Sequence, residues 1–340
     1  MREPQPKVHG PSRTASALVL IVAVASCSST PPPTGPPLPT GAYAFVVNAR
    51  TSDLQVLDAA TMEPVNDRVP VGSIPSEVVL SPDAQRAYVL SPSSNIVTVV
   101  DTRLGAVVGK PLRAGIFPSA LVLSPDGSTL YVAGGESDDV RAFDTRTHQT
   151  VGAPIAVGDA PTSIAISPDG RTIYISNQYT NDVRLIDTRT LTVVDTPIAV
   201  GLRPSQIAVS GDGRRVYVTN SGSDSVSVLD TASRRVIGGP IPVGLYPHGV
   251  VVSRDGRHVF VANQNSDTVS VLDTATAKVK RTIPVGDAPT TIALSPVGDR
   301  AYVTNMYADT VSVIDTETLR VVATSPAVAH TPRGIALGRL

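Results

Sequence analysis

Residues 216–258 read VYVTNSGSDSVSVLDTASRRVIGGPIPVGLYPHGVVVSRDGRH. Four short apolar stretches stand out in this segment, namely VYVTN, VSVLD, RVIGGPIPV and GVVVS. Clusters of Gly, Pro, Asp and Ser separate them, and short runs rich in Val and Ile between such clusters predict β-strands. The segment therefore predicts four strands, and no stretch after residue 42 spaces its apolar residues as a helix would.

This four-strand pattern occurs seven times at an almost constant spacing. The interval between equivalent residues is 43, except for a single interval of 42 in each series. A fixed period of roughly 40 to 50 residues with four strands per repeat indicates a β-propeller with one blade per repeat. The recurring positions are an aromatic residue (Phe45, Tyr88, Tyr131, Tyr174, Tyr217, Phe260, Tyr302), an aspartate (Asp58, Asp101, Asp144, Asp187, Asp230, Asp273, Asp315) and a proline (Pro75, Pro118, Pro161, Pro204, Pro247, Pro289, Pro332).

The chain enters and leaves this pattern out of phase. The first copy begins at the Phe45 strand, whereas the last copy ends just after a strand at residues 333–337. If the strand led by the recurring proline is innermost, the N-terminal segment supplies three strands of one blade and the C-terminal segment supplies the fourth. Pairing of the two ends would close the ring and protect exposed strand edges. We therefore predict that residues 42–340 form an all-β, seven-bladed β-propeller of four-stranded blades.

The recurring aspartates and aromatic residues have structural interpretations. Each aspartate sits at a strand end and six of the seven precede Thr, which favours capping of a turn over calcium binding. Phe replaces Tyr at positions 45 and 260, so the aromatic position does not require a hydroxyl. We expect this ring to pack between neighbouring blades.

Several copies share motifs in register. YVTN occurs at residues 217–220 and 302–305, with VSVLDT or VSVIDT, PVG and SPDG-like turns around it. Over residues 42–340 this arrangement resembles the YVTN-family β-propeller repeat of bacterial and archaeal surface proteins. The resemblance implies a seven-bladed propeller outside the cytoplasm and no shared catalytic residues. The absence of Trp argues against WD40 blades and against repeats that dock tryptophan around a quinone, and no CxxCH motif is present for covalent haem.

The N-terminal segment predicts the cellular localisation of the protein. Residues 1–26 carry a basic start and the apolar run of residues 15–25, typical of a secretory signal peptide. The sequence Val24-Ala25-Ser26-Cys27 resembles the lipobox of bacterial lipoproteins, so we expect Cys27 to carry diacylglycerol and fatty acid such as palmitate. The alternative is a leftover thiol in a secreted protein. Residues 27–41 would then be the lipidated cysteine and a proline-rich, extended linker that holds the propeller on the outer side of a bacterial membrane.

The residues that break the repeat pattern indicate that one face of the propeller is the binding surface. Loops between the second and third strands of a blade share a face with the loops that link blades, and the residue after each recurring proline should rim the mouth of the central channel. Aromatic residues and arginine, which are enriched in binding hot spots, gather in these positions. The candidate binding residues are Arg50, Phe117, Tyr179, Arg203, Tyr246, His248, Tyr307, His330 and Arg333.

These features favour a non-catalytic binding or scaffold module, which we expect to be monomeric. We expect a protein or glycan partner in the cell envelope and a membrane contact through the lipid anchor. A formal net charge of −1 gives no electrostatic reason to bind nucleic acid, and no metal or cofactor motif is present. Two alternatives stay open: a lactonase-like hydrolase that uses Glu77, His248 and Arg333 at the channel mouth, and an accessory subunit of an envelope redox or transport complex.

Overall fold

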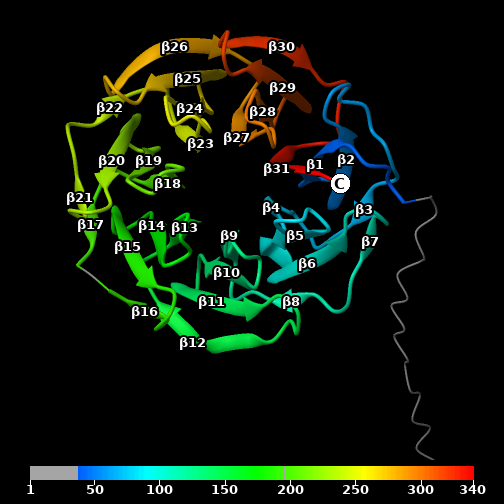
Figure 1. The fold of residues 1–340 in the computed structure, drawn as a ribbon, viewed down its shortest axis with the longest axis horizontal. Coiled ribbons are helices and arrows are strands. Elements are labelled where there is room, and N and C mark those ends of the chain that lie inside the picture. The colour runs from blue at the N-terminus through cyan, green and yellow to red at the C-terminus, as the bar shows by residue number, and fades with distance from the viewer. Residues whose placement is uncertain (1–36, 195) are drawn as a thin grey trace, which may run out of the picture. The chain divides into compact units, whose positions relative to one another are not determined.

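The computed structural model describes residues 37–194 and 196–340, which form seven antiparallel sheets arranged around a central axis (Figure 1). The seven strands led by the recurring prolines lie innermost, and each contacts the innermost strand of the next sheet around the ring. The chain is therefore a seven-bladed β-propeller, as the repeat predicted. Its one described helix is the short 3-10 turn η1 (Pro92–Ser94).

Strands are given for each blade from the centre outwards. Blade 1 contains β31 (Pro332–Arg339), β1 (Ala42–Asn48), β2 (Asp53–Asp58) and β3 (Val69–Pro70). Blade 2 contains β4 (Glu77–Leu80), β5 (Arg86–Ser91), β6 (Ile96–Asp101), β7 (Ala106–Val107) and β8 (Leu112–Arg113). Blade 3 contains β9 (Pro118–Leu123), β10 (Thr129–Gly134), β11 (Asp139–Asp144) and β12 (Thr150–Ala156).

The remaining blades follow the same order. Blade 4 contains β13 (Pro161–Ile166), β14 (Thr172–Asn177), β15 (Asp182–Asp187), β16 (Thr192–Val193) and β17 (Ile198–Ala199). Blade 5 contains β18 (Pro204–Val209), β19 (Arg215–Asn220), β20 (Ser225–Asp230), β21 (Arg235–Val236) and β22 (Ile241–Pro242). Blade 6 contains β23 (Pro247–Val252), β24 (His258–Asn263), β25 (Thr268–Asp273) and β26 (Lys278–Pro284). Blade 7 contains β27 (Pro289–Leu294), β28 (Arg300–Asn305), β29 (Thr310–Asp315) and β30 (Arg320–Thr324).

The outermost strand is the irregular one. In blades 2, 4 and 5 it is broken into two short pieces that both pair with the third strand. Proline lies between the pieces in each of these blades, at Pro111, Pro197 and Pro240. Proline lacks the N–H that a ladder needs and is tolerated at a sheet edge. In blade 3 the equivalent Pro154 lies within the continuous strand β12, whose pairing with β11 shifts register.

The two ends of the chain close the ring as predicted. β31 pairs antiparallel with β1, from Ala42 opposite Arg339 to Asn48 opposite Pro332. Beyond the strands, Gly41 and Leu340 exchange two backbone hydrogen bonds of 3.2 and 2.9 Å. The C-terminal strand is thus the innermost strand of a blade whose other three strands begin the domain.

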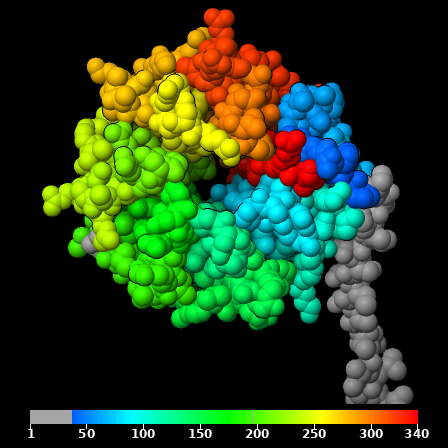
Figure 2. Space-filling model, in the orientation of Figure 1, coloured from blue at the N-terminus to red at the C-terminus, as the bar shows by residue number. Residues whose placement is uncertain are grey.

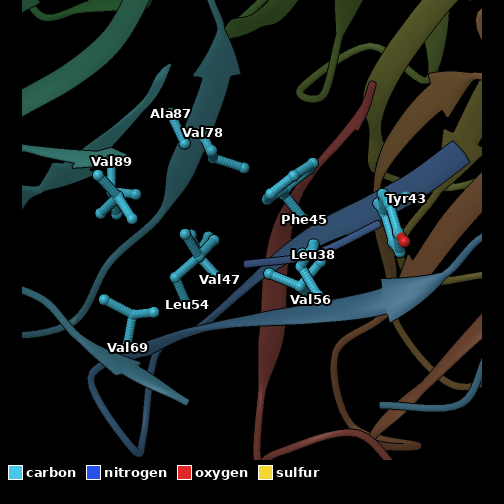
Figure 3. Close-up of a cluster of buried hydrophobic side chains, with 11 residues drawn as sticks. Leu38, Tyr43, Phe45, Val47, Leu54, Val56, Val69, Val78, Ala87 and Val89 are labelled. Atoms are coloured by element: carbon cyan, nitrogen blue, oxygen red, sulfur yellow. The ribbon is translucent and has the colours of Figure 1, made fainter. Parts of the chain in front are cut away.

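The core lies between neighbouring blades. In the first interface, Phe45 is fully buried among side chains from both blades (Figure 3). The recurring tyrosines pack in the same way, and Tyr302 also donates a 2.7 Å hydrogen bond to the carbonyl of Ala59 in the next blade. This confirms the predicted place of the aromatic position. The labelled side chains of this cluster are Leu38, Tyr43, Phe45, Val47, Leu54 and Val56 with Val69 from blade 1, and Val78, Ala87 and Val89 from blade 2.

The asparagine of YVTN and the glycine of PVG are in contact in blades that carry both motifs. The motif's asparagine, for example Asn220, is fully buried at the end of the second strand and donates to a side chain of the third. The glycine of the preceding PVG lies against this amide, as in blade 7, where a Cβ at Gly286 would come within 2.7 Å of Asn305 Cγ. Only glycine lets the chain pass this close, which explains why both motifs recur together.

One face of the ring carries two turns of each blade: the turn that joins the first strand to the second, and the turn that joins the third strand to the fourth. In blade 2 these turns are residues 81–85 and 102–105. We call this side of the ring the hairpin face. Asp144 accepts hydrogen bonds from the backbone N–H groups of Arg146 and Thr147 at 3.0 and 2.6 Å. The other recurring aspartates do the same in their own turns, which confirms capping. The threonine that follows then ties this turn to the neighbouring hairpin, as when Thr102 donates to the carbonyl of Ala84 at 2.6 Å.

The packed part of the chain extends N-terminally to Leu38. Leu38 is 5% exposed and belongs to the core cluster between blades 1 and 2. Its backbone N–H donates 2.8 Å to the carbonyl of Arg103, in a turn of the hairpin face, and the Tyr43 hydroxyl donates to the carbonyl of Pro39. Residues 38–41 therefore join the ring at the hairpin face. The predicted signal peptide and Cys27 lie outside the described residues, and within the described part no helix is long and apolar enough to cross a membrane.

Candidate functional site

The face opposite the hairpin face carries two sets of loops, which together we call the mouth face. One set precedes the inner strands and ends at the recurring prolines, and the other joins the second and third strands (residues 49–52, 92–95, 135–138, 178–181, 221–224, 264–267 and 306–309). Backbone hydrogen bonds join the two sets, for example from Gln178 to Ala160 at 2.9 Å and from Gln264 to Tyr246 at 3.0 Å. This confirms that both sets share one face.

The residue before each recurring proline has a left-handed backbone. Its φ is 43° at Phe117, 51° at Arg203 and 52° at Tyr246, and the same conformation occurs at Ala160 and Ala288. Non-glycine residues rarely adopt this conformation, and a following proline adds its own restriction. Because alanine occupies the position in two blades, the conformation belongs to the scaffold and is not confined to the candidate binding residues.

A ring of Asn and Asp side chains holds these left-handed residues in place. Asp224 accepts a 2.8 Å hydrogen bond from the backbone N–H of Tyr246, and Asn181 accepts one of 2.7 Å from Arg203. Sequence reasoning missed this ring, although Asn or Asp recurs in step with the other motifs and both tolerate a left-handed backbone. The pairs in the other blades are Asn95 with Phe117, Asp138 with Ala160, Asp267 with Ala288, and Asp309 with Thr331.

At the centre of the mouth face the ring encloses a cavity of about 340 Å³, and Figure 2 shows the opening at the middle of the ring. Inner strands from all seven blades surround it, so its walls combine side chains far apart in the sequence. Its charged or titratable residues, apart from Tyr246, are Glu77, His248 and Arg333. The lining also includes Ser76, Pro92, Phe117, Pro118, Ser119, Ala120, Thr162, Ser163, Gln206, Gln264, Thr290, Thr291 and Met306.

In four of the blades, the side chain of the residue that follows the recurring proline links one inner strand to the next. Thr162 donates a 2.9 Å hydrogen bond to the carbonyl of Pro204, and Ser119 donates likewise to Pro161. His248 occupies the equivalent position, with Nδ1 3.1 Å from the carbonyl oxygen of Thr290. Since a carbonyl can only accept, Nδ1 of His248 carries the proton. The imidazole therefore takes over the bridging role that hydroxyl groups have elsewhere in the ring.

Glu77 and Gln206 occupy equivalent positions and make the same contact. Glu77 Oε2 accepts a 3.0 Å hydrogen bond from the N–H of Leu121, and Gln206 Oε1 accepts one of 3.2 Å from Val250, each in the next blade. At the same position in blades 6 and 1 the inner strands approach too closely for any side chain, because a Cβ at Gly249 would lie 2.5 Å from the Thr290 carbonyl oxygen and one at Gly334 would lie 2.7 Å from Glu77 Cα. Glu77 therefore has a structural role that a neutral amide also fulfils.

Burial makes the two titratable side chains of the cavity prefer their neutral forms. Burial raises the pKa of Glu77 to about 7 from 4.5, and the hydrogen bond from Leu121 offsets only part of this effect. Burial also lowers the pKa of His248, and the nearby charge of Arg333 lowers it further. Below about pH 7 the guanidinium of Arg333 is thus the dominant charge in the cavity.

The structure divides the nine candidate residues into two groups. Phe117, Tyr246, His248 and Arg333 line the central cavity together. The other five lie around it in the loops of the mouth face, where Tyr179 and Tyr307 are 64% and 66% exposed. His330 is also exposed and its Nδ1 lies 2.8 Å from Asp309 Oδ2. The five outer residues are Arg50, Tyr179, Arg203, Tyr307 and His330.

The three residues of the hydrolase alternative all line one cavity, namely Glu77, His248 and Arg333. A carboxyl group with a pKa near 7 could act as a general base. However, both Glu77 and His248 are engaged in bridging contacts between blades. Among the described residues no group of three or more His, Cys, Asp or Glu side chains is placed to hold a metal ion.

Two protein families match parts of the chain. Residues 130–256 match the YNCE-like beta-propeller family, and residues 210–334 match the Cytochrome D1 heme domain family. No curated protein matches the chain. The first match and the seven-bladed ring together fit a propeller of the YVTN type.

Solved structures support the same fold. A chain of hydrazine synthase from Kuenenia stuttgartiensis is 26% identical with a TM-score of 0.70, and the alignment covers 77% of this chain and 89% of that one. A functionally unknown protein from Desulfotomaculum acetoxidans is 20% identical with a TM-score of 0.75, covering 87% and 98%. The dihydro-heme d1 dehydrogenase NirN is 19% identical with a TM-score of 0.66, covering 86% and 74%, and like the preceding structure it supports the fold alone.

Proposed function

We propose that this chain, a propeller of the YVTN type, is a non-catalytic module that binds a protein partner through its mouth face. The observation that carries the proposal is that a uniform backbone on this face displays non-uniform, exposed side chains. Positions before the prolines share one conformation and, in six blades, one hydrogen bond, yet they hold Ile, Phe, Ala, Arg, Tyr and Thr. The repeat keeps the backbone fixed while the surface chemistry varies from blade to blade.

The composition of this surface favours a protein as the partner. Large apolar side chains are exposed there together with arginines, the combination typical of protein interfaces and their hot spots. Most other exposed apolar side chains lie scattered along the outer strands and the hairpin turns. Those on the mouth face are Ile74, Ile116, Phe117, Tyr179, Leu202, Leu245 and Tyr307.

Quantitative binding after capture from envelope extracts tests this function. Replacing Tyr179 and Tyr307 together by Ala should weaken the captured partner's binding by roughly thirtyfold or more, since hot-spot residues contribute about 2 kcal/mol or more. The matched control replaces Leu104 and Val297, which are exposed apolar residues of the hairpin face, by Ala. Equal loss in both variants, or loss in neither, would contradict the proposal, and capture of a glycan in place of a protein would contradict the choice of partner.

A role as an accessory subunit of a redox complex is the second candidate. It is favoured by the hydrazine synthase chain, of which 89% aligns with this propeller, and by the match of residues 210–334 to the Cytochrome D1 heme domain family. In that case the captured partner should show the Soret absorbance of haem. A captured partner without any redox cofactor would argue against it.

The lipid anchor at Cys27 completes the proposed function. A single acyl chain binds a membrane only marginally, whereas two or more hold a protein stably. Cys27→Ala should therefore release the protein from the membrane fraction or leave its signal peptide uncleaved. Unchanged fractionation and an unchanged N-terminus would contradict the anchor while leaving the binding role of the mouth face intact.

A further inference from the structure

The central cavity has the size of a small-molecule site. Its volume of about 340 Å³ falls at the lower end of the range for ligand pockets, which is roughly 300 to 1,000 Å³. Scaffold contacts between blades hold its walls, so the site is formed before any ligand arrives. A ligand that fits there would be smaller than a typical drug molecule.

The cavity contains one cation without a partner. Within the described part of the chain, no hydrogen bond or ion pair engages the guanidinium of Arg333. Its backbone, in contrast, is held firmly, because Thr304 donates a 2.8 Å hydrogen bond to its carbonyl oxygen. Below about pH 7, where Glu77 is mostly protonated, the positive charge of Arg333 is largely unopposed.

Uncharged hydrogen-bond donors of the cavity are also available. The hydroxyl of Ser76 is buried and has no partner. Gln206 uses its oxygen to accept from Val250, so its amide N–H₂ group can donate elsewhere. Together with Arg333, these groups favour a ligand that brings acceptor oxygens and a negative charge.

The other part of the wall is apolar. Phe117 and Tyr246 line the cavity from the loops of the mouth face, and Met306 and Ala120 add aliphatic surface. Aromatic and apolar walls with a few placed polar groups are typical of sites for organic ligands, as opposed to inorganic ions.

We propose that the central cavity binds a small organic carboxylate with an apolar body, whose carboxylate pairs with Arg333 while its body packs against Phe117 and Tyr246. The inference deepens the proposed binding function of the mouth face by adding a second occupant with its own chemistry. Planar, bidentate pairing with a carboxylate is what a guanidinium does best, and a lone arginine suits a monocarboxylate.

Isothermal titration calorimetry with benzoate tests the proposal, because benzoate has the proposed charge and an aromatic body. Benzamide, which has nearly the same shape without the charge, is the matched control ligand. At pH 6, wild-type protein should bind benzoate at least about tenfold more tightly than benzamide. Arg333→Gln should remove this difference and Arg333→Lys should keep part of it. Arg146→Gln, at an exposed position in a turn of the hairpin face, should leave it unchanged.

The outcomes separate this inference from the proposed protein partner. Failure of benzoate to bind, or equal binding of benzoate and benzamide, would overturn the carboxylate site. Benzoate binding that survives Arg333→Gln would overturn the assignment to Arg333. Partner capture that depends on Tyr179 and Tyr307 would stand in either case, because neither residue lines the cavity.

Discussion

The hairpin face and the mouth face are both ordered by hydrogen bonds that repeat around the ring, but they differ in what they present to solvent. On the hairpin face nearly every copy uses the same residues, an aspartate cap and a threonine tie, so backbone and surface repeat together. On the mouth face Asn or Asp fixes each residue before the proline, yet the side chains displayed range from Ala to Tyr. Repetition of a backbone thus does not imply repetition of a surface.

Opening the ring should disrupt both faces at once and has the largest expected effect. Deleting residues 333–340 removes the innermost strand of blade 1 and its pairing with β1. Without ring closure, blade 1 would expose the edge of β1 and lose its contacts with β4 and β27. We expect loss of the cooperative thermal transition in circular dichroism. Deleting Leu340 alone should preserve the transition, and a truncated protein that melts like the full chain would show that closure is dispensable.

The cavity between the two faces should respond to pH through Glu77. Because burial raises its pKa from 4.5 to about 7, the folded state holds the proton more tightly than the unfolded state. The carboxyl group therefore opposes folding increasingly as the pH rises from about 4.5 to 7. Glu77→Gln should increase the free energy of unfolding at pH 8 by up to about 3 kcal/mol and have little effect at pH 4.

The equivalent residue in blade 5 supplies the matched control for Glu77. Gln206→Glu places a carboxyl group in the same bridging position, so it should destabilise the protein at pH 8 and much less at pH 4. Urea unfolding at both pH values measures these differences. Stabilisation by Glu77→Gln that is equal at pH 4 and pH 8 would mean that the carboxyl charge is not its cause.

A smaller effect should follow from removing one acceptor of the mouth face. Asp224→Ala deprives the backbone N–H of Tyr246 of its partner and should lower the free energy of unfolding by about 1 kcal/mol. Asp224→Asn should be nearly neutral, because Asn95 and Asn181 make the same contact in other blades. If Asn and Ala were equally destabilising in urea unfolding, the hydrogen bond would not be what holds the left-handed residue.

The fold could be predicted from the sequence because each scaffold feature is repeated seven times. A recurring proline or aspartate marks a position in every blade, and the offset of the first and last strands specifies ring closure. The mouth face could be predicted in outline for the same reason, since repeat position determines which loops lie together. The asparagine and aspartate ring recurs at the same spacing in six blades, with Ser52 in the first copy, and could have been identified from that spacing.

The cavity could not be read from the repeat in the same way. Its character depends on non-periodic residues, such as Glu77 in blade 2 and Arg333 at the C-terminal end, whose side chains meet only through the ring. The shared role of Glu77 and Gln206 depends on how closely the inner strands approach, which differs between blades with a long side chain and those with Gly249 or Gly334. Periodicity describes the average blade, and these contacts belong to particular pairs of blades.

Residues 38–41 attach to only one of the two faces of the ring, which makes the two faces unequal with respect to the N-terminal segment. Leu38 is bonded to a turn of the hairpin face and Gly41 to the last residue of the chain, so the preceding segment joins the propeller on that side. Any force that reaches the propeller through the N-terminal end, including through the lipid proposed at Cys27, therefore acts on the hairpin face. A force applied at residues 38–41 would act on the contact between blades 1 and 2 and on the pairing of the two chain ends.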